Sequence, residues 1–417
     1  MTTAAKPRTG EMIPFRPAAS LLRSGPAGRL TPAMLAAILA DLDAGHPADA
    51  MALFDEMEEK DLHLGAVTQT RFLAAAAQQR DIIPASSSAD DERIAQFVRE
   101  RLDALPHRHA LLTGLMAAVT HGFAVAEIVW DISEGHAVPA AVHIRPQRLF
   151  TFADPAAANR VSGFPRYLEP GAPKGVELPR EKFIFHRHHA ASGDFLRAGL
   201  YRGVSWYYLF TSYAIKDWLT FMDLYGVPLR LGKFKPTADE RARQVLKDAV
   251  LNLGSDAAAV ISEDTTIEFI NSALSGGHDL FQNAAEYFNR QKSKRILGQT
   301  LTTESGDKGG AYALGAVHER VREDIVAFDC RALDETLTTE LIRPMVDYNF
   351  GPRRAYPRMV TRLRRAGETK ERLDQIESLV RMGAQIPARI AAEAAGVTLL
   401  GDPEAPLTPA AKKETLA

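Results

Sequence analysis

Four consecutive residues near the middle of the chain, His186-Arg-His-His189, are the strongest candidates for chemistry. They follow a β-rich run, Lys182–Phe185, and histidines gathered at the end of a strand can bind a transition metal. In an extended chain, however, residues 186 and 188 point to one side and residue 189 to the other. The nearest carboxylate, Asp194, lies in a glycine-containing stretch. The cluster is therefore either a metal site or, as we prefer, a polar turn at a subunit surface.

The single cysteine, Cys330, excludes an internal disulfide and a cysteine-rich zinc module. A nucleophilic cysteine needs a histidine partner, and no sequence feature supplies one, so we expect Cys330 to be a buried small hydrophobic residue. The chain contains no Walker A, G-x-S-x-G, H-E-x-x-H or C-x-x-C sequence. The run 305–310 has glycines and a lysine but lacks the spacing of a phosphate-binding loop. We therefore predict no catalytic residue, no metal and no cofactor.

Two basic stretches are candidates for facing nucleic acid. The first has four cations within six residues, which are Arg290, Lys292, Lys294 and Arg295. Cations also favour the last turns of a helix, where they complement its dipole, so the residues leave both interpretations open. The second, 343–372, carries nine basic and three acidic residues, a net charge of +6. The whole chain has a charge of −2, so any surface that faces DNA must be local.

The 417 residues are enough for two or three domains, and 24% charged with 46% hydrophobic residues is typical of a globular protein. The N-terminus has no apolar segment of the kind found in secretory signals. The one long apolar run, Ala110–Trp130, is interrupted by His121-Gly122 and contains Glu127. We expect a buried helix followed by a strand there rather than a membrane span.

Elements of the N-terminal half follow from apolar spacing and from proline and glycine positions. Residues 1–30 are rich in both and predict an extended arm that packs on another surface or stays mobile. Thr31-Pro32 opens a helix, and a second helical stretch runs from Pro47 through Phe72. Further helices are expected at Ala89–Leu105 and Arg108–His121, and strands at Phe123–Asp131, Val138–Arg145, Leu149–Phe152 and Lys182–His186. Helices before strands indicate an α+β unit.

The helix expected at Gly203–Tyr225 has an unusual composition. It holds eight of the 32 aromatic residues of the chain, and its few charged residues form no continuous polar face. A helix that is apolar nearly all round must be buried on every side. Either a domain core or neighbouring copies of the same chain could cover it.

The second half alternates a small insert with long helices. The insert has expected strands at Val227–Phe234, Ala257–Ser262 and Thr265–Ile270 and a helix opened by the capping box Thr237–Glu240. A helix at His278–Leu297 and a polar glycine-bearing loop, Thr300–Gly315, come next. Apolar residues then recur at helical spacing over Leu314–Met345, which extends about 48 Å. Two short helices, Glu368–Gly383 and Pro387–Ala395, end the pattern.

This order of elements resembles the portal proteins of tailed bacteriophages, and specifically those of Mu-like phages. The strings that carry the resemblance are LFDEMEEKDLHLGAVTQTR (53–71), GFAVAEIVWD (122–131), MDLYGVPLRLGKF (222–234) and AEYFNRQKSKRILGQTLTTE (285–304). It covers about residues 30 to 395, and its specificity lies in the order and spacing of these strings.

The resemblance implies an α+β portal fold with a wing, stem helices, a small α/β clip, a long wing helix and a helical crown. Carried over by position, the parts are an N-terminal arm (1–30), the wing (31–202), the stem helices (203–226 and 278–298), the clip (227–277), the tunnel loop (299–313), the long wing helix with its return to the wing (314–366), and the crown and C-terminal tail (367–417).

The resemblance also implies function. A ring of 12 copies would form the channel for packaging and ejecting double-stranded DNA, without sequence specificity, and would connect head to tail. Its partners would be the terminase, head-completion (adaptor) proteins and the major capsid protein, with no membrane. It would be made in the bacterial host cytoplasm and reside at the portal vertex of the virion, as a structural protein and not an enzyme. The alternative is a metal-dependent nucleic-acid hydrolase that uses His186–His189.

Two sets of residues follow from the resemblance. The tunnel loop would line the DNA channel with Thr300, Thr302, Thr303, Ser305 and Lys308. The aromatic stem helix would contact neighbouring subunits through Trp206, Tyr213, Trp218 and Phe221.

Overall fold

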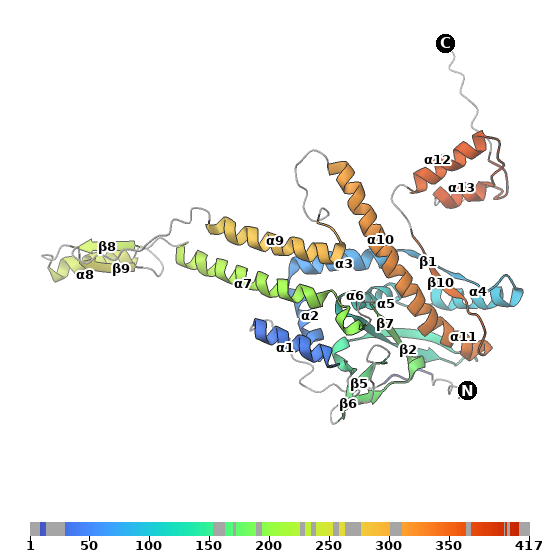
Figure 1. The fold of residues 1–417 in the computed structure, drawn as a ribbon, viewed down its shortest axis with the longest axis horizontal. Coiled ribbons are helices and arrows are strands. Elements are labelled where there is room, and N and C mark those ends of the chain that lie inside the picture. The colour runs from blue at the N-terminus through green and yellow to red at the C-terminus, as the bar shows by residue number, and fades with distance from the viewer. Residues whose placement is uncertain are drawn as a thin grey trace, which may run out of the picture.

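A pair of long helices, α7 (Tyr201–Tyr225) and α9 (Gly277–Leu297), projects from an α+β body toward a small distal unit (Figure 1). The computed structural model describes residues 9–13, 30–152, 163–169, 172–188, 194–225, 230–234, 239–252, 258–262, 277–300, 311–363, 368–395, 397 and 401–407. The mixed helix and sheet architecture confirms the predicted α+β class.

Three helices open the body: α1 (Pro32–Asp43), α2 (Ala48–Lys60) and α3 (Leu62–Ala76). Thr31 caps α1, since its Oγ1 accepts a hydrogen bond from the Met34 amide at 3.2 Å. Asp61 ends α2 and caps α3, where its Oδ1 accepts from the Leu64 amide at 2.9 Å. The single stretch expected from Pro47 is therefore two helices. The other body helices are α4 (Ala89–Asp103), α5 (Arg108–Leu115) and α6 (Ala117–His121).

The central sheet has the antiparallel order β3-β2-β7, with β2 (Phe123–Asp131) between β3 (Val138–Arg145) and β7 (Phe183–Arg187). Val125 pairs with Arg145 on one side and with Phe185 on the other. Because both neighbours and the helices cover it, β2 is buried along its first eight residues. Glu127, in the middle of the strand, is fully buried and paired with Arg145. Among the described residues, none of the helices is both long and apolar enough to cross a membrane.

Two smaller sheets complete the body. One joins β1 (Gln79–Ile83) to β10 (Arg358–Arg362) in antiparallel register, so that Gln79 lies opposite Arg362. The other has the order β4-β5-β6 and comprises β4 (Phe150–Thr151), β5 (Arg166–Glu169) and β6 (Ala172–Glu177). Short 3₁₀ turns at Gln147–Leu149 and Arg180–Lys182 connect strands, and a third, Phe195–Arg197, precedes α7.

The distal unit, at the far end of the helix pair, contains β8 (Arg230–Phe234), α8 (Glu240–Asn252) and β9 (Ala258–Ser262), with β8 and β9 parallel (Figure 1). The predicted strand, helix and strand are thereby confirmed. The further strand expected at Thr265–Ile270 lies outside the described residues.

The long helix predicted over Leu314–Met345 is not one uninterrupted α-helix. It consists of α10 (Ala311–Leu337), a π-helical turn (Thr338–Ile342) and α11 (Arg343–Phe350). Pro344 explains the turn, because proline has no amide hydrogen and its ring collides with the preceding turn of an α-helix. The Arg343 amide instead donates to the Thr338 carbonyl, five residues back.

The two ends of the chain are described only in part. Of the N-terminal arm, Thr9–Ile13 packs on the body: the Gly10 amide donates to the Trp130 carbonyl at 2.9 Å, and the Ile13 amide to Glu127 Oε1 at 2.7 Å. For these residues, the expectation that the arm packs on another surface is therefore correct. At the other end, the two predicted short helices are present as α12 (Glu368–Arg381) and α13 (Ala388–Ala395), and they pack on each other.

Candidate functional site

The end of α9 is held on the body by a buried polar joint. Lys292 is fully buried and forms an ion pair with Asp61, and it also donates to Asn289 Oδ1 at 3.2 Å. One residue on, Ser293 Oγ lies 2.7 Å from His63 Nε2 of α3. Burial lowers the pKa of Lys292, and the Asp61 carboxylate opposes that shift. Of the two interpretations left open for this basic run, the DNA-facing one does not hold for Lys292, because its charge is enclosed and already paired.

A second contact ties together both flanks of the segment 301–310. Arg71 of α3 bonds Asp329 of α10 through Nε to Oδ2 (2.7 Å) and Nη2 to Oδ1 (2.9 Å). Its Nη1 donates to the Ile296 carbonyl, 2.7 Å away, in the last turn of α9. Gly298, the residue after α9, has a φ of +71°. A Cβ atom added there would lie 2.9 Å from the side chain of Ile325 on α10. The helix before the loop and the helix after it are thus fixed to one arginine.

The predicted channel residues fall mostly on that segment. Thr302, Thr303, Ser305 and Lys308 lie outside the described residues. Thr300, three residues after the end of α9, is half-buried. The channel-lining role of this segment stays a prediction.

The other predicted cations are accessible to solvent. Arg290 is half-buried, while Lys294 and Arg295 are exposed on α9. Arg295 borders two adjoining hollows, of about 500 and 340 Å³, which meet at Gly203 near the start of α7. Arg197 and Arg202 lie in the wall of the larger hollow, where both bond Asp43 at 2.8 Å. The root of the helix pair therefore presents a locally basic surface.

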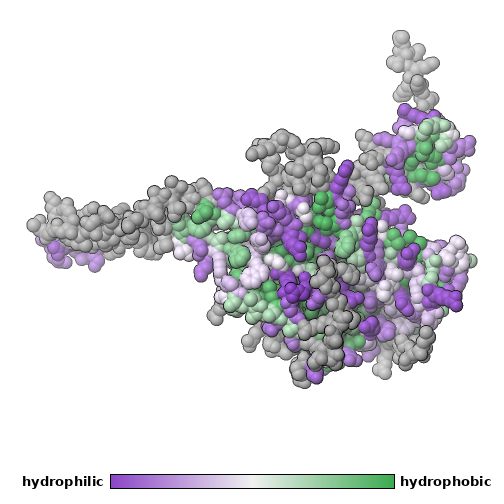
Figure 2. Space-filling view, viewed as in Figure 1, coloured by the Kyte–Doolittle hydropathy of each residue, from purple (hydrophilic) through white to green (hydrophobic). Residues whose placement is uncertain are grey.

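One side of α7 packs on the body and the other stays open. Tyr201 and Tyr208 are buried, whereas Phe210 and Tyr213 are each 41% exposed. Of the remaining predicted interface residues, Trp206, Trp218 and Phe221 are half-buried, and the Phe221 ring lies 5.7 Å from that of Phe281 on α9. Figure 2 shows hydrophobic residues along part of the helix pair, with hydrophilic residues beside them. Exposed apolar surface of this extent is typical of a protein–protein contact.

The histidine cluster does not form a metal site in the part of the chain that the structure describes. His186 is 2% exposed, and its Nδ1 lies 2.8 Å from Thr336 Oγ1 of α10. The His188 ring packs edge-on against Phe328, and His189 lies outside the described residues. No group of three or more metal-binding side chains occurs among those described. The preference for a surface turn is also wrong for His186, which packs against α10.

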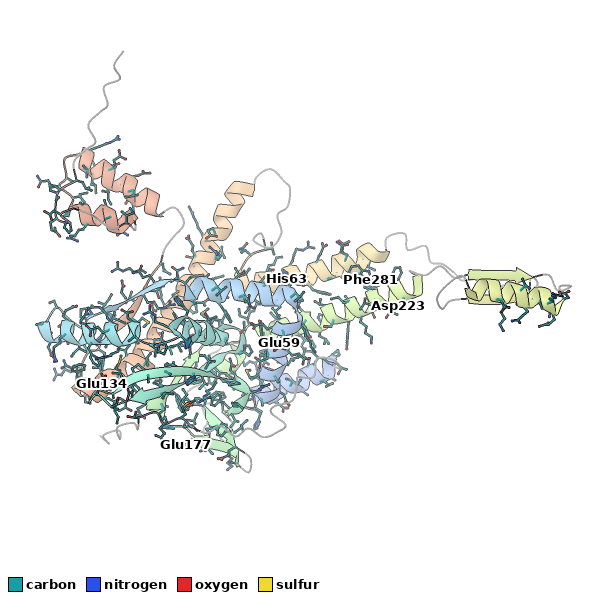
Figure 3. The ribbon with its side chains drawn as sticks, turned by 180° about the vertical axis from the view of Figure 1, so that it is seen from behind. Glu59, His63, Glu134, Glu177, Asp223 and Phe281 are labelled. Carbon is teal, nitrogen blue, oxygen red and sulfur yellow. The ribbon has the colours of Figure 1, made fainter. Side chains whose placement is uncertain are left out.

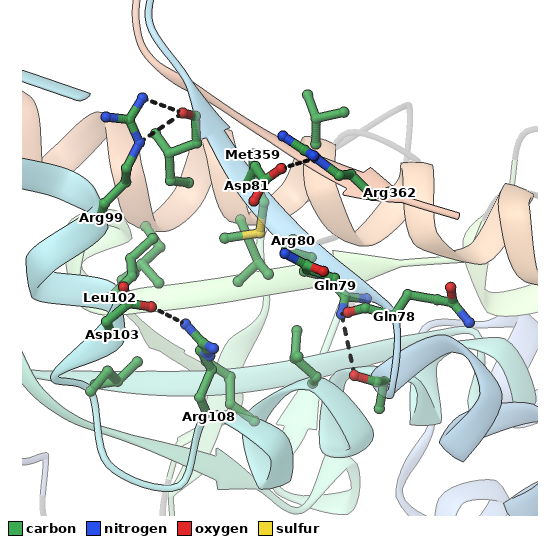
Figure 4. A pocket seen from close by; sticks show the side chains of 18 of the residues that line it. Gln78, Gln79, Arg80, Asp81, Arg99, Leu102, Asp103, Arg108, Met359 and Arg362 are labelled. Atoms are coloured by element: carbon green, nitrogen blue, oxygen red, sulfur yellow. Dashed lines mark hydrogen bonds and ion pairs between the residues drawn. The ribbon is translucent and has the colours of Figure 1, made fainter. Parts of the chain in front are cut away.

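A cavity of about 710 Å³ lies where β1 meets α4 and α5 (Figure 4). The charged residues in its walls form ion pairs with one another: Arg362 pairs with Asp81, and Arg108 pairs with Asp103 at 2.7 Å. Arg99 bonds the Ile82 carbonyl at 2.9 Å. Sequence reasoning missed this cavity because it depends on the long-range β1–β10 pairing. Its arginines have structural partners, and Leu102 of α4, Leu112 of α5 and Leu337 of α10 form part of its lining.

The family model described as the portal protein of Mu bacteriophage matches residues 51–397. The chain belongs to this family. It is 30% identical over 369 residues to the Mu-like prophage FluMu protein gp29 of Haemophilus influenzae, covering 87% of this chain and 69% of that protein. It is 33% identical over 325 residues to the portal protein of Escherichia phage Mu, covering 78% and 62%.

A solved structure contains a chain with a similar fold. The chain aligns with one in the virion of a native gene transfer agent particle at a TM-score of 0.52 and 14% identity, covering 81% of this chain and 90% of that one. At this identity the likeness shows the fold alone. The predicted portal fold and the resemblance to Mu-like portals are confirmed, and the hydrolase alternative has no support. The portal chain spans just over two thirds of the FluMu protein and less than two thirds of the Mu portal protein.

Proposed function

We propose that twelve copies of this portal chain form a closed ring at one vertex of a capsid. The observation that carries the proposal is the open aromatic side of α7, where Phe210 and Tyr213 are exposed although the helix is long and apolar. Beyond the body, Leu219 (53%) and Leu280 (62%) are exposed as well. Neighbouring subunits would remove this surface from water, which favours association by roughly 25 cal/mol per Å² of apolar area buried.

The channel of the ring would pass double-stranded DNA into and out of the capsid. In this proposal the stem is 203–226 with 278–298, and the tunnel loop is 299–313. The loop carries Glu304, Asp307 and Lys308, so it is nearly neutral, and its hydroxyl groups can contact phosphates without reading bases. A nearly neutral lining would let DNA slide, whereas a strongly basic one would hold it.

The other parts would supply contacts with the rest of the particle. The clip, 227–277, would bind the terminase and the head-completion proteins. The wing, 31–202 and 314–366, and the crown, 367–417, would face the capsid interior and the major capsid protein. After synthesis in the host cytoplasm the protein would reside in the virion, where its role is structural and ATP hydrolysis belongs to the terminase.

Electron microscopy of the purified chain tests the proposal. We expect rings with a central hole, and a mass by light scattering that is a multiple of 45.6 kDa near twelvefold. A stable, soluble monomer under every assembly condition would contradict it.

A further inference from the structure

The root of the helix pair carries one distinctive surface, here called the aromatic–basic face. It consists of Trp206, Phe210 and Tyr213 on α7, Lys294 and Arg295 on α9, and Arg197 and Arg202, which share Asp43. Four cations and one acid leave a charge of +3. Among the described residues no ion pair to Lys294 or Arg295 occurs, so both charges are available to a partner.

A second surface, here called the acidic–leucine face, lies on α2 and α3. It consists of Asp55, Glu58 and Glu59 on α2 and of Leu62 at the start of α3. The three acids give a charge of −3. The adjacent Lys60 does not reduce it, because Lys60 forms an ion pair with Glu56, which is outside this set. Leu62 is 84% exposed, so it adds apolar contact area beside the three acids.

The two faces lie on opposite sides of α7. The Tyr201 hydroxyl donates to Glu58 of α2 at 2.9 Å and lies 2.9 Å from Thr68 of α3, so α2 and α3 cover the Tyr201 side. Phe210 follows nine residues later, and at 3.6 residues per turn it points half a turn away from Tyr201. Figure 3, seen from behind, labels Glu59 and His63 on the α2 and α3 side.

A ring places unlike surfaces of the same chain against each other, because each subunit contacts the next in a head-to-tail manner. The two faces are complementary in the way that such a contact requires. Their charges are opposite, +3 and −3, and each of them also exposes apolar surface. We propose that the acidic–leucine face of one subunit docks on the aromatic–basic face of the next. This inference rests on the proposed ring, and it identifies which surface of a second copy covers the aromatic side of α7.

Charge-reversed variants test which two surfaces are in contact, whereas ring formation by the wild type does not. One variant carries Lys294→Glu with Arg295→Glu, and the other carries Asp55→Lys with Glu59→Lys. Each variant alone brings like charges together, so we expect its ring yield at low salt to fall about tenfold or more. An equimolar mixture should restore rings, because in alternating order every contact again joins opposite charges.

The controls are Glu134→Lys and Arg354→Glu, exposed residues outside both faces, which should assemble like the wild type. If the wild type forms no rings, the proposed function fails. If wild-type rings form and either reversed variant also forms them alone, or the mixture does not recover them, the docking is overturned while the ring function stands.

Cross-linking covers the case in which a reversed variant does not fold. The sole natural cysteine, Cys330, is buried, so cysteines placed at Glu59→Cys and Arg295→Cys would be the reactive ones. Mixed single variants treated with a short bismaleimide should give only dimers, and the double variant should give a ladder up to the full ring. Rings that form without any such cross-link would overturn the docking.

Discussion

Arg71 and Asp329 form a bidentate ion pair, with two hydrogen bonds, that joins α3 to α10, and both side chains are almost completely buried. The same guanidinium holds the last turn of α9 through the Ile296 carbonyl. Three helices that are far apart in sequence therefore meet at one side chain. The helices on either side of the proposed tunnel loop are fixed to the body there, so motion of the loop need not disturb them.

Replacing either member of this pair should strongly destabilise the subunit. Arg71→Ala leaves the Asp329 carboxylate buried without its partner, and Asp329→Ala does the same to the arginine. Loss of one partner of a buried pair typically costs about 3–5 kcal/mol. Urea unfolding monitored by circular dichroism measures the change. Arg381→Ala, which breaks the exposed pair with Glu377, is the control and should leave the midpoint unchanged. A wild-type midpoint for both buried variants would show that the pair carries no stability.

How well each element could be predicted from this sequence depends on how far apart its interacting residues lie along the chain. Strands β2 and β3 match the predicted bounds because their apolar runs end at turn residues that are local signals. Strands β1 and β10 were missed, because Gln79 pairs with Arg362 across most of the chain and neither strand is strongly apolar. The burial of Lys292 was missed for the same reason, since Asp61 is 231 residues away. The Arg71 joint had no local signal at all.

Truncating stem aromatics should separate assembly from folding. Trp218 and Phe221 lie beyond the body on α7 and are only half-buried in the single subunit. If they pack between subunits, Trp218→Ala or Phe221→Ala should lower ring yield much more than the thermal midpoint of the monomer. Truncation of a well-buried aromatic costs about 3–5 kcal/mol, and here that loss would appear on assembly. Phe54→Ala, at a fully buried core residue, is the comparison and should lower both. Equal losses at Trp218 and Phe54 would place Trp218 in a core within one subunit.

Two glycines with positive φ should respond differently to alanine. Gly122, at the start of β2, has φ +96°, and an added Cβ would lie 2.4 Å from the Phe195 carbonyl oxygen. Gly135 has φ +82° but nothing within 4 Å. Gly122→Ala combines backbone strain with a collision that only a backbone shift can relieve, so we expect a loss of about 2–5 kcal/mol. Gly135→Ala meets the strain alone, about 1–2 kcal/mol. Chemical denaturation of both variants measures the difference, and equal losses would contradict the close approach at Gly122.

The single cysteine should be nearly inert in the folded protein. Burial raises the pKa of the Cys330 thiol from its usual 9.0 to about 11. Since only the thiolate reacts, the reactive fraction at pH 8 falls about a hundredfold, and limited access slows labelling further. The rate should rise about tenfold per pH unit until the pKa is reached. Labelling with a chromogenic disulfide reagent measures it, with Glu134→Cys as an exposed reference in the same chain. Equal rates for Cys330 and the reference at pH 8 would contradict the burial.

Replacement of the proposed tunnel loop should affect DNA transport and not assembly. The anchors lie outside the loop: Arg71 holds Ile296 and Asp329, and Lys292 pairs with Asp61. A linker of glycine and alanine in place of Thr300–Gly310 leaves all of them intact, so rings should form at the wild-type yield. The linker removes the threonine hydroxyls and Lys308, which are the groups able to contact passing phosphates. We therefore expect packaged DNA, measured as nuclease-protected genome per particle, to fall sharply.

A scrambled loop of the same composition is the matched control, because it keeps the hydroxyls and the charge while changing their order. Contacts with a DNA backbone carry no sequence information, so the scrambled loop should retain most of the packaging that the linker loses. Normal packaging by the linker variant would contradict the channel role. A ring structure with this loop on the outer rim would do the same, since residues there could not touch DNA in the channel.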